Sequence, residues 1–321
     1  MRNYKPILVV GGEPNSIFLE IFFKSIKTKN FKSPVILIVS LKVFLLQMKK
    51  LKASCNYRII KFNDLKENRQ KLEKINLIDI EYSTNKAFKK ISQDSKNYIK
   101  DSFEIALKII KLGITNKLIN GPISKKFFLE KKYLGITELL AKKTNSQNFA
   151  MLIYNKSLSV SPLTTHLPLK MVNKKLNVKM IINKIQILNE FYINNLNTRP
   201  KIALLGLNPH CESTHQFNED EKILKPAVIR LKKKGIIING PISADTAFLK
   251  NNRKKFNLIA GMYHDQVLTP IKTIFEYDAI NITVGLPFIR ISPDHGPNEK
   301  MIGKNVSNYK SLLRAFEFLD F

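Results

Sequence analysis

Short apolar runs followed directly by turn residues recur along this chain of 321 residues and limit how it can fold. The first is PILVV at 6–10, which precedes the turn GGEPNS and an apolar-periodic segment over 17–26. A buried strand, a glycine turn and a helix in this order begin an α/β unit. The free N–H groups at the helix start could bind a phosphate or nucleotide, so Gly12 and Glu13 are candidate cofactor-binding residues. GGEP is not a G-x-G-x-x-G fingerprint, however, and an ordinary tight turn is the alternative.

The same alternation continues along the chain and predicts an α/β fold throughout. Further strands are predicted at 34–40, 117–120, 149–154, 158–162, 201–205 and 258–262, and further helices at 41–50, 95–112, 135–143 and 173–196. Thr137 could cap the helix over 135–143. The polar, lysine-rich region 51–90 is expected to form short edge strands and loops and to contribute few functional residues.

The pentapeptide NGPIS occurs twice, at 120–124 and 239–243, each time after a predicted strand. Open α/β sheets bind ligands beyond the carboxyl ends of their strands. The repeat therefore predicts two turns that face a shared cleft at that edge, with proline fixing the chain direction in each.

The net charge of +29 raises the question of nucleic-acid or membrane binding. Lysines are scattered over nearly every predicted helix, which is typical of a solvated surface that also attracts anionic small substrates. A basic nucleic-acid-binding protein without catalytic activity remains an alternative class, but no specific nucleic-acid partner is predicted. No apolar run approaches the roughly 20 residues that cross a bilayer. The two cysteines, Cys55 and Cys211, form no metal-spacing motif, so a cytoplasmic protein without membrane attachment is expected.

Three of the five histidines, His166, His210 and His264, follow three separate predicted strands. Because the carboxyl ends of parallel strands meet at one edge of a sheet, these side chains can converge although they are distant in sequence. Three neutral imidazoles are a good site for zinc or another divalent first-row ion. Taken alone, each of these histidines would more often be a structural residue. Asp245 and Asp265 are candidates for orienting such ligands or for moving a proton.

Two cations, Lys272 and Arg290, stand among apolar runs near the end of the chain. An unpaired charge is costly there, so each is expected to meet an anion such as a phosphate or carboxylate. For Arg290 the alternative is a structural ion pair with Asp294 or another carboxylate. Asn281 could orient a substrate or a neighbouring strand. Asp294 and His295 could organise a cofactor or transfer a proton, and a capped turn is the alternative.

Several motifs in register resemble the 4-hydroxythreonine-4-phosphate dehydrogenase family of pyridoxal phosphate biosynthesis. The longer of these motifs are TTHLPL at 164–169, GLNPH at 206–210, NGPISADT at 239–246, YHDQ at 263–266 and NITVGLPFIRISPDHG at 281–296. Two shorter motifs, GEP at 12–14 and GITE at 135–138, extend the resemblance to nearly the whole chain.

The resemblance implies a two-domain α/β/α fold like that of the isocitrate and isopropylmalate dehydrogenases. The active site is expected in the interdomain cleft at the interface of a homodimer. We place one domain at 1–125 plus 296–321 and the other, which carries most metal and substrate residues, at 126–295. The implied ligands of one divalent metal ion (Zn, Mg or Co) come from both subunits and are His166, His210 and His264. The implied substrate-binding residues are Thr137, Lys272, Asn281 and Arg290.

The implied reaction is an NAD- or NADP-dependent oxidation of 4-phosphooxy-L-threonine to 2-amino-3-oxo-4-phosphooxybutanoate, which decarboxylates to 3-amino-2-oxopropyl phosphate. Three features depart from the family pattern. Ile136 replaces the histidine of GHTE, GEPNSIFLE replaces GEPAGIGPE, and the loop over 211–215 differs from AGEGG. An isoleucine cannot hydrogen-bond a phosphate or hydroxyl, so the same chemistry on another phosphorylated hydroxy acid is an alternative.

Overall fold

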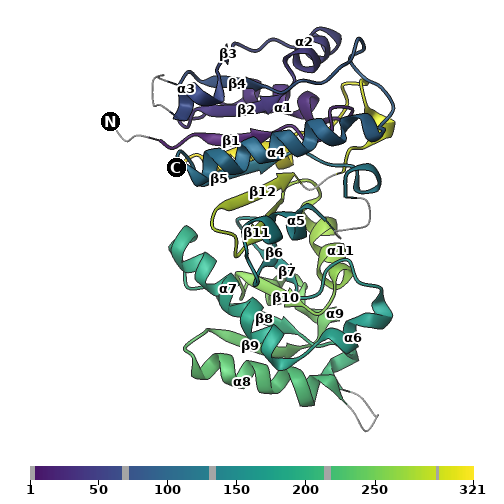
Figure 1. The fold of residues 1–321 in the computed structure, drawn as a ribbon. Helices are drawn as coiled ribbons and strands as arrows, with labels where there is room; N and C mark the ends of the chain where they lie inside the picture. The colour runs from purple at the N-terminus through teal and green to yellow at the C-terminus, as the bar shows by residue number, and fades with distance from the viewer. Residues whose placement is uncertain (1–3, 67–71, 130–134, 213–217, 294–295) are drawn as a thin grey trace. The chain divides into compact units, whose positions relative to one another are not determined.

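The computed structural model describes residues 4–66, 72–129, 135–212, 218–293 and 296–321. The chain divides into two compact units. The first unit is Met1–Leu140 with Pro287–Phe321, and the second is Ala141–Leu286. Figure 1 labels the helices and strands of both, and each unit is described by itself.

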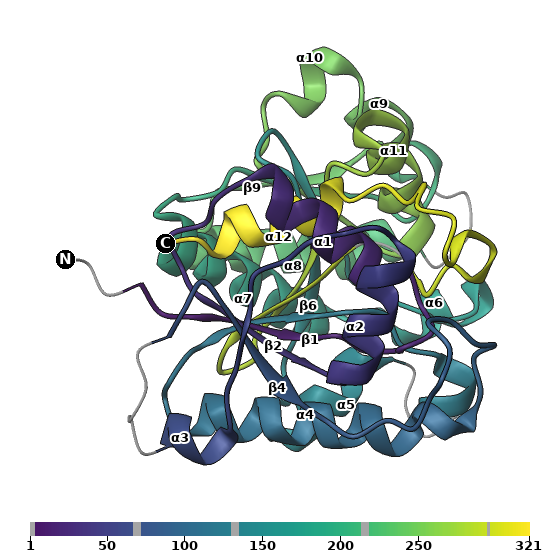
Figure 2. The same cartoon turned by 90° about the horizontal axis from the view of Figure 1, so that it is seen from above.

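The first unit contains a sheet in which every pair of neighbouring strands is parallel, in the order β3-β4-β2-β1-β5-β12. Figure 2 shows α1, α2 and α12 on one face of this sheet and α4 on the other. The strands are β1 (Ile7–Val10), β2 (Val35–Val39), β3 (Arg58–Ile59), β4 (Ile75–Asp79), β5 (Lys117–Asn120) and β12 (Ile289–Pro293). The helices are α1 (Phe18–Thr28), α2 (Leu41–Lys50), α3 (Phe62–Lys66), α4 (Lys96–Lys111) and α12 (Lys310–Leu319), while α5 (Ile136–Lys143) runs from this unit into the second.

The central strands of this sheet are apolar along their whole length because helices cover both faces. Every residue of β1 and β2 is buried, as expected for a parallel sheet enclosed on both sides. The prediction for 51–90 was wrong in one respect. β4 is no edge strand, since it pairs with β2 on one side and β3 on the other and buries Ile75–Ile78.

The second unit contains a mixed sheet in the order β11-β6-β7-β10-β8-β9. The pairs β11–β6 and β6–β7 are antiparallel, and β7, β10, β8 and β9 run parallel. Its strands are β6 (Ala150–Tyr154), β7 (Ser159–Pro162), β8 (Ile202–Leu205), β9 (Ile238–Ile242), β10 (Leu258–Gly261) and β11 (Ile280–Val284). Its helices are α6 (Val172–Lys175), α7 (Val178–Leu196), α8 (Lys225–Lys233), α9 (Ala244–Ala247), α10 (Lys250–Arg253) and α11 (His264–Phe275).

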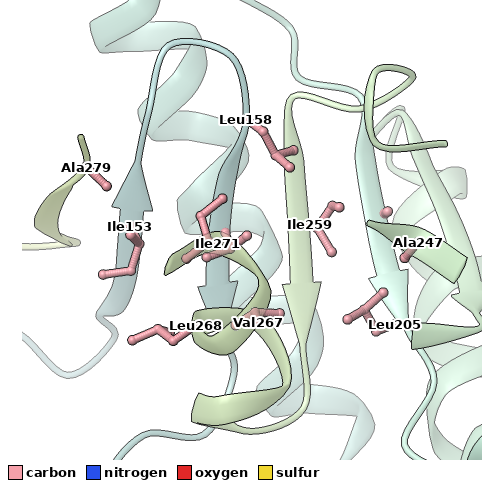
Figure 3. Packing of buried hydrophobic residues seen from close by; sticks show 11 residues of the cluster. Ile153, Leu158, Leu205, Ala247, Ile259, Val267, Leu268, Ile271 and Ala279 are labelled. Carbon is pink, nitrogen blue, oxygen red and sulfur yellow. The ribbon is translucent and has the colours of Figure 1, made fainter. Parts of the chain in front are cut away.

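Helix α11 packs on this second sheet through an apolar face. Figure 3 shows Val267 and Ile271 of the helix beside side chains of the strands, including Ile153 and Ile259. All four are buried, so the helix is fixed by apolar packing along its length. That packing holds the helix start, where His264 lies, against the end of β10.

The second unit corrects three predictions. The helix predicted over 173–196 is interrupted, because Asn177 leaves the helical conformation and its side-chain oxygen accepts from the Met180 N–H at 2.9 Å to cap α7. Helix α11 was not predicted. The second NGPIS copy forms much of β9 rather than a turn, because Asn239 and Ile242 pair with β8.

The prediction that Thr137 caps its helix was also wrong, since α5 begins one residue earlier, at Ile136. Among the described residues, no helix is long and apolar enough to cross a membrane.

Candidate functional site

Four neighbouring parallel strands of the second unit end at the same edge of its sheet. The segments that follow β7, β10, β8 and β9 carry, in that spatial order, His166, His264, His210 and Asp245. The three histidines therefore lie at one sheet edge although the sequence separates them widely.

Two of these imidazoles are adjacent. The ring centroids of His166 and His264 are 6.0 Å apart. Two imidazoles bound to one zinc at about 2.1 Å place their ring centres roughly 5 Å apart, so this separation is close to that of two ligands of one metal. His264 Nδ1 lies 2.6 Å from Asp265 Oδ1. In metalloproteins in general, a carboxylate contact of this kind fixes the ring of a metal-binding histidine. Within the described part of the chain, no three His, Cys, Asp or Glu side chains already form a complete metal-binding group.

The third histidine shares a pocket with Asp245. His210, Asp245, Asn208, Tyr263 and Gln266 contribute to the lining of this pocket of about 430 Å³. The Ser243 hydroxyl donates to the Asp245 carboxylate at 2.6 Å and, with the nearby His210, lowers the pKa of that carboxylate. The arrangement places an imidazole and an ionised carboxylate in the lining of one pocket.

Backbone strain coincides with two of the histidines. His166 has a φ of 49° and His210 a φ of 55°, in the left-handed region that residues other than glycine rarely adopt. Such conformations cost about 1–3 kcal/mol each and cluster where function requires an orientation. Both side chains are exposed, so a ligand in solution can reach them directly.

Lys272 and Asn281 also belong to the second unit. Lys272 lies on α11, about two turns beyond His264, and is half-buried. Asn281 lies on β11 opposite Ile153 of β6 and is half-buried as well. Asp265 is exposed at the first turn of α11.

Arg290 lies on β12 of the first unit and is buried, with 2% of its surface exposed. Its Nε donates to Asn120 Oδ1 at 2.6 Å and a terminal nitrogen donates to Thr137 Oγ1 at 3.2 Å. Burial lowers the pKa of Arg290 to about 10, and the charge of Glu138 opposes that shift. The guanidinium therefore stays charged at neutral pH, and the oxygens of Asn120 and Thr137 help to orient it.

The residues Gly12 and Glu13 are part of a buried loop. Gly12 has a φ of 73°, and a Cβ there would lie 2.4 Å from the Pro122 carbonyl oxygen, so only glycine fits. Glu13 is 1% exposed and its carboxylate accepts from the Asn15 N–H at 3.1 Å and the Ser95 hydroxyl at 2.7 Å. Burial raises the pKa of this carboxyl. The hydrogen bonds that it accepts hold the loop in its conformation.

Sequence reasoning missed two residues that contact candidate site residues. Asn120, the partner of Arg290, is the first residue of the NGPIS repeat, and that repetition was its only signal. Gln266 stands two residues after His264 in the YHDQ motif and lines the pocket of His210. Asp294 and His295 lie outside the described residues.

The two α/β units have the fold of a known class of dehydrogenase. A β-decarboxylating dehydrogenase from Thermococcus kodakarensis matches with a TM-score of 0.50 at 11% identity, covering 98% of this chain and 81% of that one. The chain belongs to the family described as pyridoxal phosphate biosynthetic protein PdxA, whose model matches residues 31–319.

Similar proteins within this family are named as dehydrogenases. A 4-hydroxythreonine-4-phosphate dehydrogenase of Sulfurihydrogenibium is 36% identical over 317 residues, covering 97% of this chain and 96% of its own. A crystal structure of the enzyme with that name from Klebsiella pneumoniae matches with a TM-score of 0.85 at 28% identity, covering 99% and 97%. A D-threonate 4-phosphate dehydrogenase of Pectobacterium atrosepticum is 38% identical over 187 residues, covering 57% of each chain.

Proposed function

We propose that this protein oxidises 4-phosphooxy-L-threonine, using NAD or NADP and one divalent metal ion. The product, 2-amino-3-oxo-4-phosphooxybutanoate, then loses carbon dioxide to give 3-amino-2-oxopropyl phosphate. The observation that carries the proposal is the placement of His166, His264 and His210 at neighbouring strand ends. The match over 97% of the chain to a relative named for this activity supports it.

The three histidines are proposed to hold the metal. Their nitrogen donors suit Zn²⁺ and Co²⁺, and Mg²⁺ is the third candidate. A divalent ion bound there would polarise the substrate hydroxyl and make loss of its proton easier. Asp265 orients His264 through its 2.6 Å contact, and Asp245 or Asp265 could accept a proton. A homodimer whose subunits share the ligands is part of this proposal.

The proposed substrate-binding residues are Thr137, Lys272, Asn281 and Arg290. Lys272 and Arg290 supply positive charge for the phosphate and carboxylate groups. Arg290 suits this role because Asn120 fixes its fork and burial strengthens its electrostatic interactions. A cytoplasmic location is also proposed, in keeping with the free thiols of Cys55 and Cys211.

The test is reduction of NAD or NADP by the purified protein, given 4-phosphooxy-L-threonine and Zn²⁺, Co²⁺ or Mg²⁺ in turn. We expect turnover that a chelator abolishes and that His210→Ala lowers by at least ~100-fold, because one of three metal ligands is lost. Absence of turnover with either cofactor and all three metals would refute the proposal.

A second candidate substrate is 4-phospho-D-threonate, the substrate in the name of the Pectobacterium relative. The observation that favours it is Ile136, which begins α5 next to Thr137 with a side chain that cannot hydrogen-bond. Both substrates should be compared by kcat/KM in the wild type and in Ile136→His. Higher kcat/KM for the D-threonate compound would assign that substrate. If the ratio of the two kcat/KM values is the same in Ile136→His and in the wild type, residue 136 does not determine which substrate is preferred.

A further inference from the structure

The loop that carries His210 is built around one buried carboxylate, that of Asp220. Its Oδ1 accepts from the Leu207 N–H at 2.8 Å. Its Oδ2 accepts from the Asn208 N–H at 3.0 Å and from the Asn208 side-chain amide at 2.9 Å. A buried charge is costly unless hydrogen bonds satisfy it, and bonds to a charged acceptor are about twice as strong as neutral ones. The three N–H groups therefore tie residues 207 and 208 to Asp220.

Asp220 is in turn fixed by the helical segment that it begins. The Asn218 side-chain oxygen accepts from the Asp220 N–H at 3.0 Å. The segment Asp220–Leu224 continues into α8, and Leu224 is fully buried. The carboxylate therefore belongs to packed structure, whereas the loop that it holds is exposed at His210.

The backbone of this loop is strained at His210 and Cys211, which have φ values of 55° and 62°. Residues other than glycine keep such conformations only where the surrounding contacts impose them. The contacts here are the bonds from the preceding residues to Asp220 and the bond from the Cys211 N–H to the Asn208 carbonyl at 3.1 Å. Gly206 makes the close approach possible, since a Cβ there would lie 2.9 Å from Asp220 Oδ1 and 2.6 Å from Cys211 Sγ.

We infer that Asp220 is a positioning residue for the metal site: its carboxylate holds the loop 206–211 in the conformation that presents the His210 imidazole to a metal ion. The inference rests on the proposed function, because it takes His210 as a metal ligand. Every subunit carries the same loop, so the inference is independent of which subunit supplies the other ligands. A loop that adopts its binding conformation for only a fraction of the time has its metal affinity reduced by that fraction.

The test is titration of the metal-free protein with Co²⁺, followed by the visible absorption band of the bound ion. Asp220→Asn keeps the size of the side chain but has one acceptor oxygen, so at least one of the three N–H groups loses its acceptor. We expect this variant to bind Co²⁺ about 10-fold more weakly than the wild type, as for other groups that orient metal ligands. In the metal-free protein, the amides of Leu207 and Asn208 should exchange hydrogen faster, as measured by NMR. Circular dichroism and gel filtration restrict the comparison to folded protein in the wild-type state of assembly.

Ile282→Ala is the matched control, because Ile282 is fully buried on β11, at the end of the second sheet away from β8. It lowers stability through a cavity and should bind Co²⁺ as the wild type does. If Asp220→Asn does not fold, Asn208→Ala tests the same contact from its half-buried partner. This variant should bind Co²⁺ more weakly and exchange the Leu207 amide faster, whereas a direct contact of Asn208 with the metal would leave that exchange unchanged.

Two results would overturn the inference, and they differ in meaning. A folded Asp220→Asn protein whose Co²⁺ affinity matches that of the wild type, or falls no further than that of Ile282→Ala, would refute the positioning role alone. If Asp220→Asn does not fold, wild-type affinity in Asn208→Ala has the same meaning. A wild-type Co²⁺ signal that is absent, or unchanged in His210→Ala, would refute the metal site of the proposed function and this inference with it.

Discussion

Arg290 is a buried side chain whose guanidinium is fixed by neighbouring polar groups. Its guanidinium is oriented by Asn120 and Thr137, and neither contact removes its charge. The expected interaction with an anion stays a prediction. Of the alternative partners, Asp294 lies outside the described residues, while the charge of another carboxylate, Glu138, acts on Arg290.

Arg290→Lys should weaken substrate binding because lysine cannot reproduce the planar fork that Asn120 and Thr137 hold. We expect KM for the phosphorylated substrate to rise at least ~30-fold, equivalent to about 2 kcal/mol, with a smaller change in kcat. Arg253→Lys is the control, since Arg253 of α10 donates a hydrogen bond to the Phe248 carbonyl. Equal KM values in Arg290→Lys and the wild type would exclude Arg290 from the substrate site.

Glu13 predicts a pH dependence of stability. Burial raises the pKa of its carboxyl in the folded state above the unfolded value, so the folded protein holds this proton more tightly. The resulting stabilisation is complete below the unfolded pKa and is lost as pH rises through the folded pKa. Glu13→Gln removes the titration, so the variant should gain stability relative to the wild type as pH rises from acid toward neutral.

Urea unfolding at several pH values from acid to neutral measures this difference. Asp101→Asn, a change at an exposed residue of α4, serves as the control. A difference between Glu13→Gln and the wild type that is constant with pH would show that Glu13 is ionised equally in both states.

At the scale of elements, the cap of α7 separates this helix from α6. Asn177→Ala removes the 2.9 Å bond from the Met180 N–H and should lower the free energy of unfolding by about 1 kcal/mol. Asn177→Asp keeps an acceptor and should retain most of the stability. Urea unfolding compares the three proteins, and an alanine variant within ~0.3 kcal/mol of the wild type would contradict the role of the cap.

Local sequence signals predicted most elements because strand and helix periodicities are short-range. The strands β6 and β7 and the helix α4 lie where the sequence predicted them. Helix α11 was not predicted because polar and charged residues separate its apolar residues, Val267, Leu268 and Ile271, and because Pro270 interrupts the helical pattern. Packing on the sheet outweighs that local penalty.

At the scale of the whole molecule, the net charge of +29 predicts non-specific attraction to polyanions. Duplex DNA should bind at low salt and dissociate near physiological salt, at about 150 mM, because the attraction is screened and counterion release weakens. Fluorescence anisotropy with two unrelated duplexes of equal length measures this. Binding that survives physiological salt and prefers one duplex would instead favour the nucleic-acid-binding alternative.

The sequence by itself determined that an α/β chain carries histidines at strand ends, because strand, turn and helix signals are local and each histidine directly follows one strand. Tertiary structure alone decided which of these strand ends are neighbours. Strand order β7-β10-β8 puts His166 beside His264. In the first unit, the pairing of β12 with β5 brings Arg290 to Asn120 across 170 residues. Long-range pairing depends on the apolar surface that each element buries against another, which periodicity along the chain does not encode.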